Sequence, residues 1–213
     1  SSRIVQGYLA SSPAVTVRVR VYGDKGYMIV ENINNPQSIA IYNLNDELIK
    51  EIKVPMIIDA DGINALSTNI DILKDAQAPV ILTPHPGEMS RLCGKTVADI
   101  IANPIGNADD FAKKYGVTVV LKTANTVVCS KDSPAVYVNT TGNSGLSKGG
   151  SGDLLAGMTA SFVAQGMIPH NAAVAAVYLH GLAADIVAER TSMRGMLPSD
   201  VLNFLPELFS KFE

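Results

Sequence analysis

The sequence predicts an α/β fold over residues 54–213, with a parallel sheet between two layers of helices, preceded by a β-rich segment over residues 1–53. Two observations predict it. After Pro55, short apolar runs alternate with helical stretches, as expected for strands buried on both faces. Six of the chain's 17 glycines lie between Gly142 and Gly157, and they stop where Asp153 opens an apolar-periodic run, which indicates a loop entering a helix. A chain of 213 residues has room for one such domain and a small appendage.

The composition argues against several classes of partner. A net charge of −3 and a pI near 5.6 provide no basic surface for nucleic acid. We expect no membrane association, because no stretch approaches the roughly 18 to 20 apolar residues that span a bilayer. Cys93 and Cys129 lack neighbouring Cys or His at ligand spacing, which favours reduced thiols. With no signal-peptide pattern at the first residues, a cytoplasmic location is predicted.

The first segment reads as antiparallel strands joined by hairpins. Apolar and polar residues alternate from Val15 to Tyr22, and turn residues then precede runs at 27–31, 38–42 and 47–52. Three or four strands are expected. No His, Cys or paired acid suggests chemistry there, so a structural or adhesive module is predicted. The part from Val19 to Val54 also resembles small β-sandwich modules of secreted bacterial proteins, which favours an origin outside the α/β domain.

The elements expected after residue 53 follow in chain order. Strands are predicted at 56–58, 80–82, 117–121, 127–130 and 135–138, the last two as a hairpin, and helices at 65–74, 89–93, 97–102, 107–115, 153–165 and 170–190 and after Ser199. Gly116 suits a C-cap, Pro169 a first helical turn and Ser199 an N-cap. His180, alone among small residues, is more typical of a satisfied core histidine than of a ligand.

Polar residues follow the strands of the predicted sheet where each strand ends. Because ligands bind at the carboxyl edge of open α/β sheets, these clusters are expected to converge there. They are Asp59, Asp61 and Asn64; His85 and Glu88; Lys122 and Thr126; and Gly152 with Asp153.

The glycine-rich loop is suited to a phosphate. Glycines let the backbone approach a ligand closely, and the free N–H groups at the start of the helix favour an anion. A carboxylate that faces a phosphate weakens phosphate binding by charge repulsion, so its presence suggests a role in the reaction. Asp153 is therefore a candidate base for a hydroxyl that attacks the phosphate. The alternative is that Asp153 is an N-cap and the glycines form a flexible linker.

Four motifs in this order and spacing resemble the ADP/ATP-dependent NAD(P)H-hydrate dehydratase family, a branch of the ribokinase-like kinases. They are VPMIIDADGINAL, ILTPHPGEMSRL, VVLKTANTVV and NTTGNSGLSKGGSGDLLAGMTASFVAQG. The resemblance covers Val54 to Glu213 and implies a ribokinase-like three-layer sheet. The HPGE and GGSGD motifs together are specific for this family, whereas the glycine-rich loop alone is compatible with many ribokinase-like enzymes.

The resemblance also implies roles for single residues. Asp153 would be the catalytic base and would contact the hydrated nicotinamide. His85, Asn64 and Glu88 would also bind this substrate. ADP or ATP would be held by Lys122, Thr123, Ala124, Asn125, Thr126, Gly149, Gly150 and Gly152. Magnesium is expected on the phosphates, but no ligand is assigned, since Glu88, Asp59 and Asp61 could place it through water or equally cap a helix or turn.

The implied reaction is phosphorylation of the substrate hydroxyl followed by elimination of phosphate, which restores NADH or NADPH. The glycine-containing strand–loop–helix and the GPGLG-type turn that normally precede the DAD motif are absent, so the sheet is expected to be incomplete on its N-terminal side. Two alternatives stay open: a small-molecule kinase for a vitamin precursor, and a truncated, non-catalytic adenine-nucleotide-binding module. The family usually forms symmetric oligomers, and a homo-oligomer is expected here.

Overall fold

The computed structural model describes residues 5–7, 19–23, 26–30, 38–42 and 48–212, with side chains from residue 54 onward. The chain divides into two compact units. One comprises Ser1–Met56 and Ala76–Pro79, and the other Ile57–Asp75 and Val80–Glu213.

The first unit contains a five-stranded antiparallel sheet whose strands lie in chain order. They are β1 (Val5–Gly7), β2 (Val19–Gly23), β3 (Gly26–Val30), β4 (Ser38–Tyr42) and β5 (Leu48–Lys53). Val21 lies opposite Met28, and Tyr27 lies opposite Tyr42. The predicted antiparallel strands are confirmed, with one strand more than expected; the alternation predicted before residue 19 lies outside the described residues.

The second unit is built on a mixed sheet. Its strands are β6 (Met56–Ile58), β7 (Val80–Leu82), β8 (Thr118–Leu121), β9 (Val127–Ser130) and β10 (Ser133–Val138), in the spatial order β10-β9-β8-β7-β6. β7 and β8 are parallel, whereas β8, β9 and β10 form an antiparallel meander, because the links between them are too short for a crossover. The predicted hairpin is confirmed, and the parallel sheet is corrected to a mixed one.

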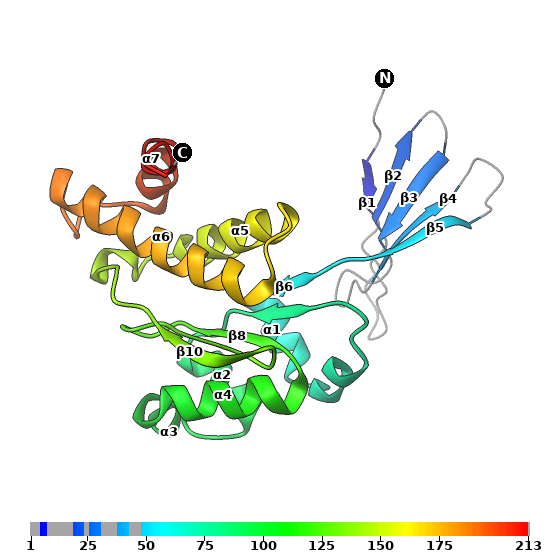
Figure 1. Ribbon diagram of the computed structural model, residues 1–213, viewed down its shortest axis with the longest axis horizontal. Coiled ribbons are helices and arrows are strands. Elements are labelled where there is room, and N and C mark those ends of the chain that lie inside the picture. The colour runs from blue at the N-terminus through cyan, green and yellow to red at the C-terminus, as the bar shows by residue number, and fades with distance from the viewer. Residues whose placement is uncertain (1–4, 8–18, 24–25, 31–37, 43–47, 213) are drawn as a thin grey trace. The chain divides into compact units, whose positions relative to one another are not determined.

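Helices cover both faces of this sheet, as Figure 1 shows. They are α1 (Asp61–Leu66), α2 (Pro86–Cys93), α3 (Val97–Ala102), α4 (Pro104–Tyr115), α5 (Ser151–Ala164), α6 (Pro169–Arg190) and α7 (Pro198–Phe209), with 3₁₀ turns at Ile70–Asp75 and Ser144–Leu146. α4 packs on β8 and β9 from one side, and α6 packs on β7, β8 and β9 from the other. The three-layer α/β architecture is therefore as predicted.

Helices α2 and α4 each start three residues earlier than predicted, and two further helices differ for local reasons. The helix expected at 65–74 is two elements, because α1 starts at Asp61 and the hydroxyls of Ser67 and Thr68 bond to carbonyl oxygens of its last turn. Ser199 lies inside α7 and is not its N-cap. Instead the Asp200 carboxylate accepts a 2.8 Å hydrogen bond from the Leu197 N–H.

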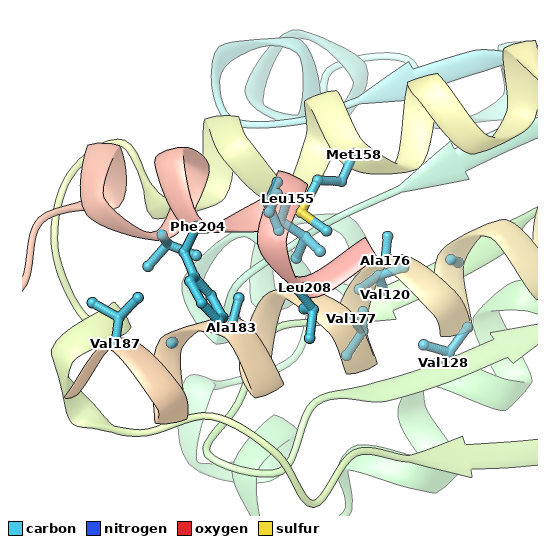
Figure 2. Close-up of a cluster of buried hydrophobic side chains, with 14 of the residues drawn as sticks. Val120, Val128, Leu155, Met158, Ala176, Val177, Ala183, Val187, Phe204 and Leu208 are labelled. Atoms are coloured by element: carbon cyan, nitrogen blue, oxygen red, sulfur yellow. The ribbon is translucent and has the colours of Figure 1, made fainter. Parts of the chain in front are cut away.

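A hydrophobic cluster of buried residues lies where α5, α6 and α7 meet the sheet. In Figure 2, side chains from all three helices form this cluster together with Val120 and Val128 of the strands. α6 is 22 residues long and has a mean hydropathy of 1.4, so one helix in the described part of the chain could by length and composition cross a membrane. This corrects the expectation that no apolar stretch approaches that length. Half of α6 is buried against its neighbours, as in the core helix of a folded domain.

Replacing Leu208 with alanine should lower the free energy of unfolding by about 2 to 5 kcal/mol, because the change leaves a cavity in this cluster. Leu208 is 1% exposed. Leu202 on the same helix is 52% exposed and provides the matched control, for which we expect a change within about 0.5 kcal/mol. Urea denaturation of both variants measures the difference, and equal effects would contradict this account of the core.

Candidate functional site

The second unit contains a cavity of about 790 Å³ at the carboxyl end of β8 and the start of α5. That volume falls within the range of about 300 to 1,000 Å³ typical of small-ligand sites. Five predicted ligand-binding residues line it besides His85: Lys122, Thr123, Ala124, Thr126 and Gly152. Segments far apart in the sequence therefore meet at one cavity, at the edge of the sheet where a ligand site was predicted from the polar residues that follow the strands.

The start of α5 is built to face an anion. Its N-cap is Gly150 at φ 94°, a left-handed conformation that glycine adopts without strain, and no side chain caps the helix. Ser151 and Gly152, the first two residues of the helix, line the cavity. With no capping side chain on the backbone N–H groups of the first turn, a ligand can pair with them and with the positive end of the helix dipole.

Asp153 is the acidic residue in this first turn. It is exposed, so its carboxylate is not lost in packing, and it directly follows Gly152 at the cavity wall. The alternative interpretation of Asp153 as an N-cap is wrong, because Gly150 holds that position and Asp153 lies inside the helix. The carboxylate is therefore exposed to solvent beside the cavity, although Asp153 itself does not line it.

An ion pair joins two strand ends beside this turn. Lys122 follows β8 and donates a 2.6 Å hydrogen bond to Asp59, which follows β6. The two side chains are only 22% and 14% exposed. A Cβ added at Gly152 would lie 3.3 Å from the Asp59 Oδ2 and 3.4 Å from the Lys122 Nζ, so a side chain there would crowd both charges. The start of α5 therefore lies against a cation and a carboxylate.

His85 caps α2 and reaches the cavity wall. Its Nδ1 accepts hydrogen bonds from the N–H groups of Gly87 and Glu88, at 3.0 and 3.3 Å, and the Glu88 carboxylate accepts from the His85 N–H at 2.8 Å. The Glu88 side chain is 5% exposed, and its other oxygen lies 3.3 Å from the His85 Nε2. This pairing assigns the ring proton to Nε2. Glu88 therefore orients the histidine, and its binding of substrate stays a prediction.

Other predicted site residues lie outside the cavity lining. Asn64 accepts a 3.0 Å hydrogen bond from Arg91 and lies near Asp61. Asn125 donates to the Asn139 carbonyl at 3.2 Å and so braces the loop that lines the cavity. Gly149 and Gly150 shape the turn into α5 without lining the cavity.

The sequence did not predict the tethers of the glycine-rich loop. The Asp185 carboxylate on α6 accepts hydrogen bonds from the Gly142 N–H at 2.8 Å and from the Asn143 amide at 2.9 Å. Lys148, which lines the cavity, donates to the carbonyl oxygens of Arg194 and Met196. The only available signal was the position of this lysine inside the glycine-rich stretch. These bonds hold the loop between α6 and the segment before α7.

The chemistry of this end of the cavity fits a magnesium ion carried by phosphates. Among the residues described with side chains, no group of three or more His, Cys, Asp or Glu could hold a metal by itself. Mg²⁺ commonly takes one or two protein carboxylates and completes its shell with water and phosphate oxygens. Asp59 and Asp153, which flank Gly152, are the carboxylates available for this role.

The two cysteines lie away from this cavity and are free thiols. Burial is the main cause that raises the pKa of the Cys129 thiol, to about 12, and it also raises the pKa of Cys93. Neither thiol is therefore suited to act as a nucleophile.

Replacing Lys122 with alanine should weaken ADP binding by about 10- to 100-fold, the effect of losing a hydrogen bond to a charged group. Isothermal titration with ADP measures it. Lys131 is exposed and lies outside the cavity, so Lys131→Ala is the matched control and should bind as the parent does. An unchanged ADP affinity in Lys122→Ala would remove Lys122 from the ligand site.

The fold and the cavity define a ribokinase-like α/β protein. A ribokinase-like superfamily protein from Enterococcus faecalis is 32% identical, with a TM-score of 0.64 over 73% of this chain and 52% of that one. More specifically, the chain belongs to the NAD(P)H-hydrate dehydratase family, whose model matches residues 36–207.

Two relatives narrow the comparison. The ADP/ATP-dependent NAD(P)H-hydrate dehydratase of Bacillus subtilis, co-crystallised with ATP/Mg²⁺, is 33% identical with a TM-score of 0.66, over 75% of this chain and 55% of that one. The bifunctional NAD(P)H-hydrate repair enzyme Nnr of Moorella thermoacetica is 41% identical over 174 residues, or 82% of this chain. The chain spans only 33% of that relative's length.

Proposed function

We propose that this chain catalyses the ADP- or ATP-dependent dehydration of hydrated NADH and NADPH. The observation that carries the proposal is the meeting of the uncapped start of α5 with Lys122 at one cavity, where Asp59 pairs with the lysine beside Gly152. Such a site combines amide donors, a cation and carboxylates, as the transfer of a phosphoryl group requires. The names of the relatives from B. subtilis and M. thermoacetica supply the substrate.

In this proposal Asp153 accepts the proton of the substrate hydroxyl while the hydroxyl oxygen attacks the terminal phosphorus. An oxygen–phosphorus bond forms, and the bond between that phosphorus and the bridging oxygen of the nucleotide breaks. The phosphate then leaves the ring with its bonding electron pair, and the adjacent ring carbon loses a proton. These steps restore the double bond of the dihydronicotinamide and release inorganic phosphate.

The neighbouring residues position the reactants in this scheme. Lys122 and the amides at the start of α5 bind the phosphates, where fixed donors stabilise the charge that builds up during transfer. Thr123, Ala124 and Thr126 form the nucleotide side of the wall. His85, whose ring is held by Glu88, lines the wall that would face the nicotinamide part of the substrate. When bound, Mg²⁺ would neutralise phosphate charge, with Asp59 and Asp153 nearby.

Recovery of NADH absorbance tests the proposal. The protein is incubated with hydrated NADH, magnesium and either ADP or ATP, and we expect recovery that depends on both nucleotide and protein. Recovery no faster than the spontaneous rate would refute dehydration. A stable phosphorylated product would instead identify a small-molecule kinase, and ADP binding without either product would identify a non-catalytic module. A cytoplasmic, homo-oligomeric enzyme remains our expectation, and size-exclusion chromatography with light scattering tests the assembly.

A further inference from the structure

His180 on α6 is a buried histidine that the proposed reaction does not use. Its side chain lies in the cavity wall and only 6% of the residue is exposed. The Nε2 is fully buried, yet no described residue gives it a hydrogen-bond partner. The prediction of a satisfied core histidine was right about the burial and wrong about the hydrogen bonds.

A buried polar atom without a partner is rare in native proteins, and such atoms are normally paired with protein, water or a ligand. The Oγ of Ser151, at the start of α5, is a second unpaired buried atom in the same wall. Of the three buried unpaired side-chain atoms in the described part of the chain, two therefore belong to this cavity. Because both belong to residues of the cavity wall, a small rotation of either side chain toward the cavity would let a bound molecule pair with them.

The state of His180 defines the chemistry of that molecule. Burial lowers the pKa of the imidazole to about 4, so the ring is neutral near pH 7 and offers one donor and one acceptor. The charged and titratable side chains that share the cavity wall are Lys122, Lys148 and His85. A neutral imidazole contributes little to phosphate binding beside two lysines. It can, however, form hydrogen bonds with an uncharged group that has both a donor and an acceptor.

The surroundings of His180 on α6 agree with an uncharged group. Val177 and Gly181, its neighbours on α6 in the cavity wall, carry no charge, and Leu155 lines the same space from α5. We propose that His180 is a specificity-determining residue that hydrogen-bonds the nucleoside part of the bound adenine nucleotide, through a sugar hydroxyl or a base nitrogen. This inference rests on the nucleotide site of the proposed function but not on the dehydration step.

Binding measurements separate the nucleoside from the phosphates. Titration calorimetry would compare the parent protein, His180→Leu and His180→Gln with ADP, 2′-deoxy-ADP, GDP and inorganic pyrophosphate. We expect His180→Leu to bind ADP at least about tenfold more weakly, as when one hydrogen bond to a buried polar group is lost, with pyrophosphate binding unchanged. His180→Gln should retain part of the affinity. If the leucine change weakens ADP but not 2′-deoxy-ADP, the sugar is the contact; if it weakens ADP but not GDP, the base is.

A readout on the unaltered protein covers the case in which a variant does not fold. The chain has three histidines, so ¹⁵N-histidine labelling yields few imidazole signals. The His180 signal, assigned by its loss in His180→Gln or by elimination, should shift with ADP and not with pyrophosphate.

Three outcomes would overturn the inference. They are an unchanged ADP affinity in His180→Leu, an equal loss of affinity for ADP and pyrophosphate in that variant, and a His180 signal that does not shift when ADP is added. Failure of dehydration with these shifts intact would refute only the proposed reaction.

Discussion

Replacing Asp153 with asparagine should reduce turnover by about 10²- to 10⁴-fold, the contribution typical of a positioned general base. Asparagine keeps the size of the side chain but cannot take the proton of the substrate hydroxyl. Nucleotide binding should survive, because Asp153 is exposed and lies outside the cavity lining. In titrations without magnesium, removal of a negative charge beside a phosphate site should if anything tighten ADP binding.

The rate of NADH recovery and the calorimetric ADP affinity, measured on the same preparation, check this prediction. Asp110→Asn is the control, since Asp110 is an exposed helical carboxylate on α4, which packs on the other face of the sheet from α5 and α6. It should leave both quantities unchanged. Full activity in Asp153→Asn would exclude this residue as the base, and a matching loss of ADP binding would assign it a structural role instead.

The sequence predicted the parts of the site that strand ends determine. Asp59, His85 and Lys122 each follow a strand, and parallel strands bring their carboxyl ends to one edge. The positions of these residues after the strands therefore predicted that they lie together, but they did not predict the ion pair between Asp59 and Lys122, which are 63 positions apart. The antiparallel pairing of β9 with β8 could not be predicted either, because both strands are short apolar runs whose relative direction the sequence does not indicate.

The α6 side of the cavity could not be predicted, for a physical reason. His180, Gly181 and Asp185 lie on a helix whose apolar and small residues give no sign of which face meets a ligand. Their roles depend on tertiary contacts: Asp185 bonds the glycine-rich loop, and the hydroxyl of Thr141 donates to the Tyr178 carbonyl at 2.9 Å. Only the packing of the loop on α6 reveals them.

Gly181→Ala tests this packing directly. A Cβ at Gly181 would lie 2.3 Å from the Thr141 Oγ1 and 2.7 and 2.8 Å from its backbone carbon and oxygen. Since backbone atoms cannot rotate away as a side chain can, the loop or α6 must move. Within a helix, alanine is otherwise favoured over glycine by about 1 kcal/mol. Overpacking costs about 1 to 3 kcal/mol, so we expect a net loss in the free energy of unfolding.

The displaced loop should also weaken ligand binding, because Thr141 and Gly142 line the cavity. We expect about a tenfold loss of ADP affinity, since shifted partners lose about one hydrogen bond. Gly157→Ala is the matched control on α5: nothing lies within 4 Å of its added Cβ, so the same change should raise the free energy of unfolding by up to about 1 kcal/mol and leave ADP binding intact. Opposite signs in thermal denaturation would show that close packing requires glycine at position 181, whereas a stabilised Gly181→Ala with normal ADP affinity would mean that α6 does not hold the loop.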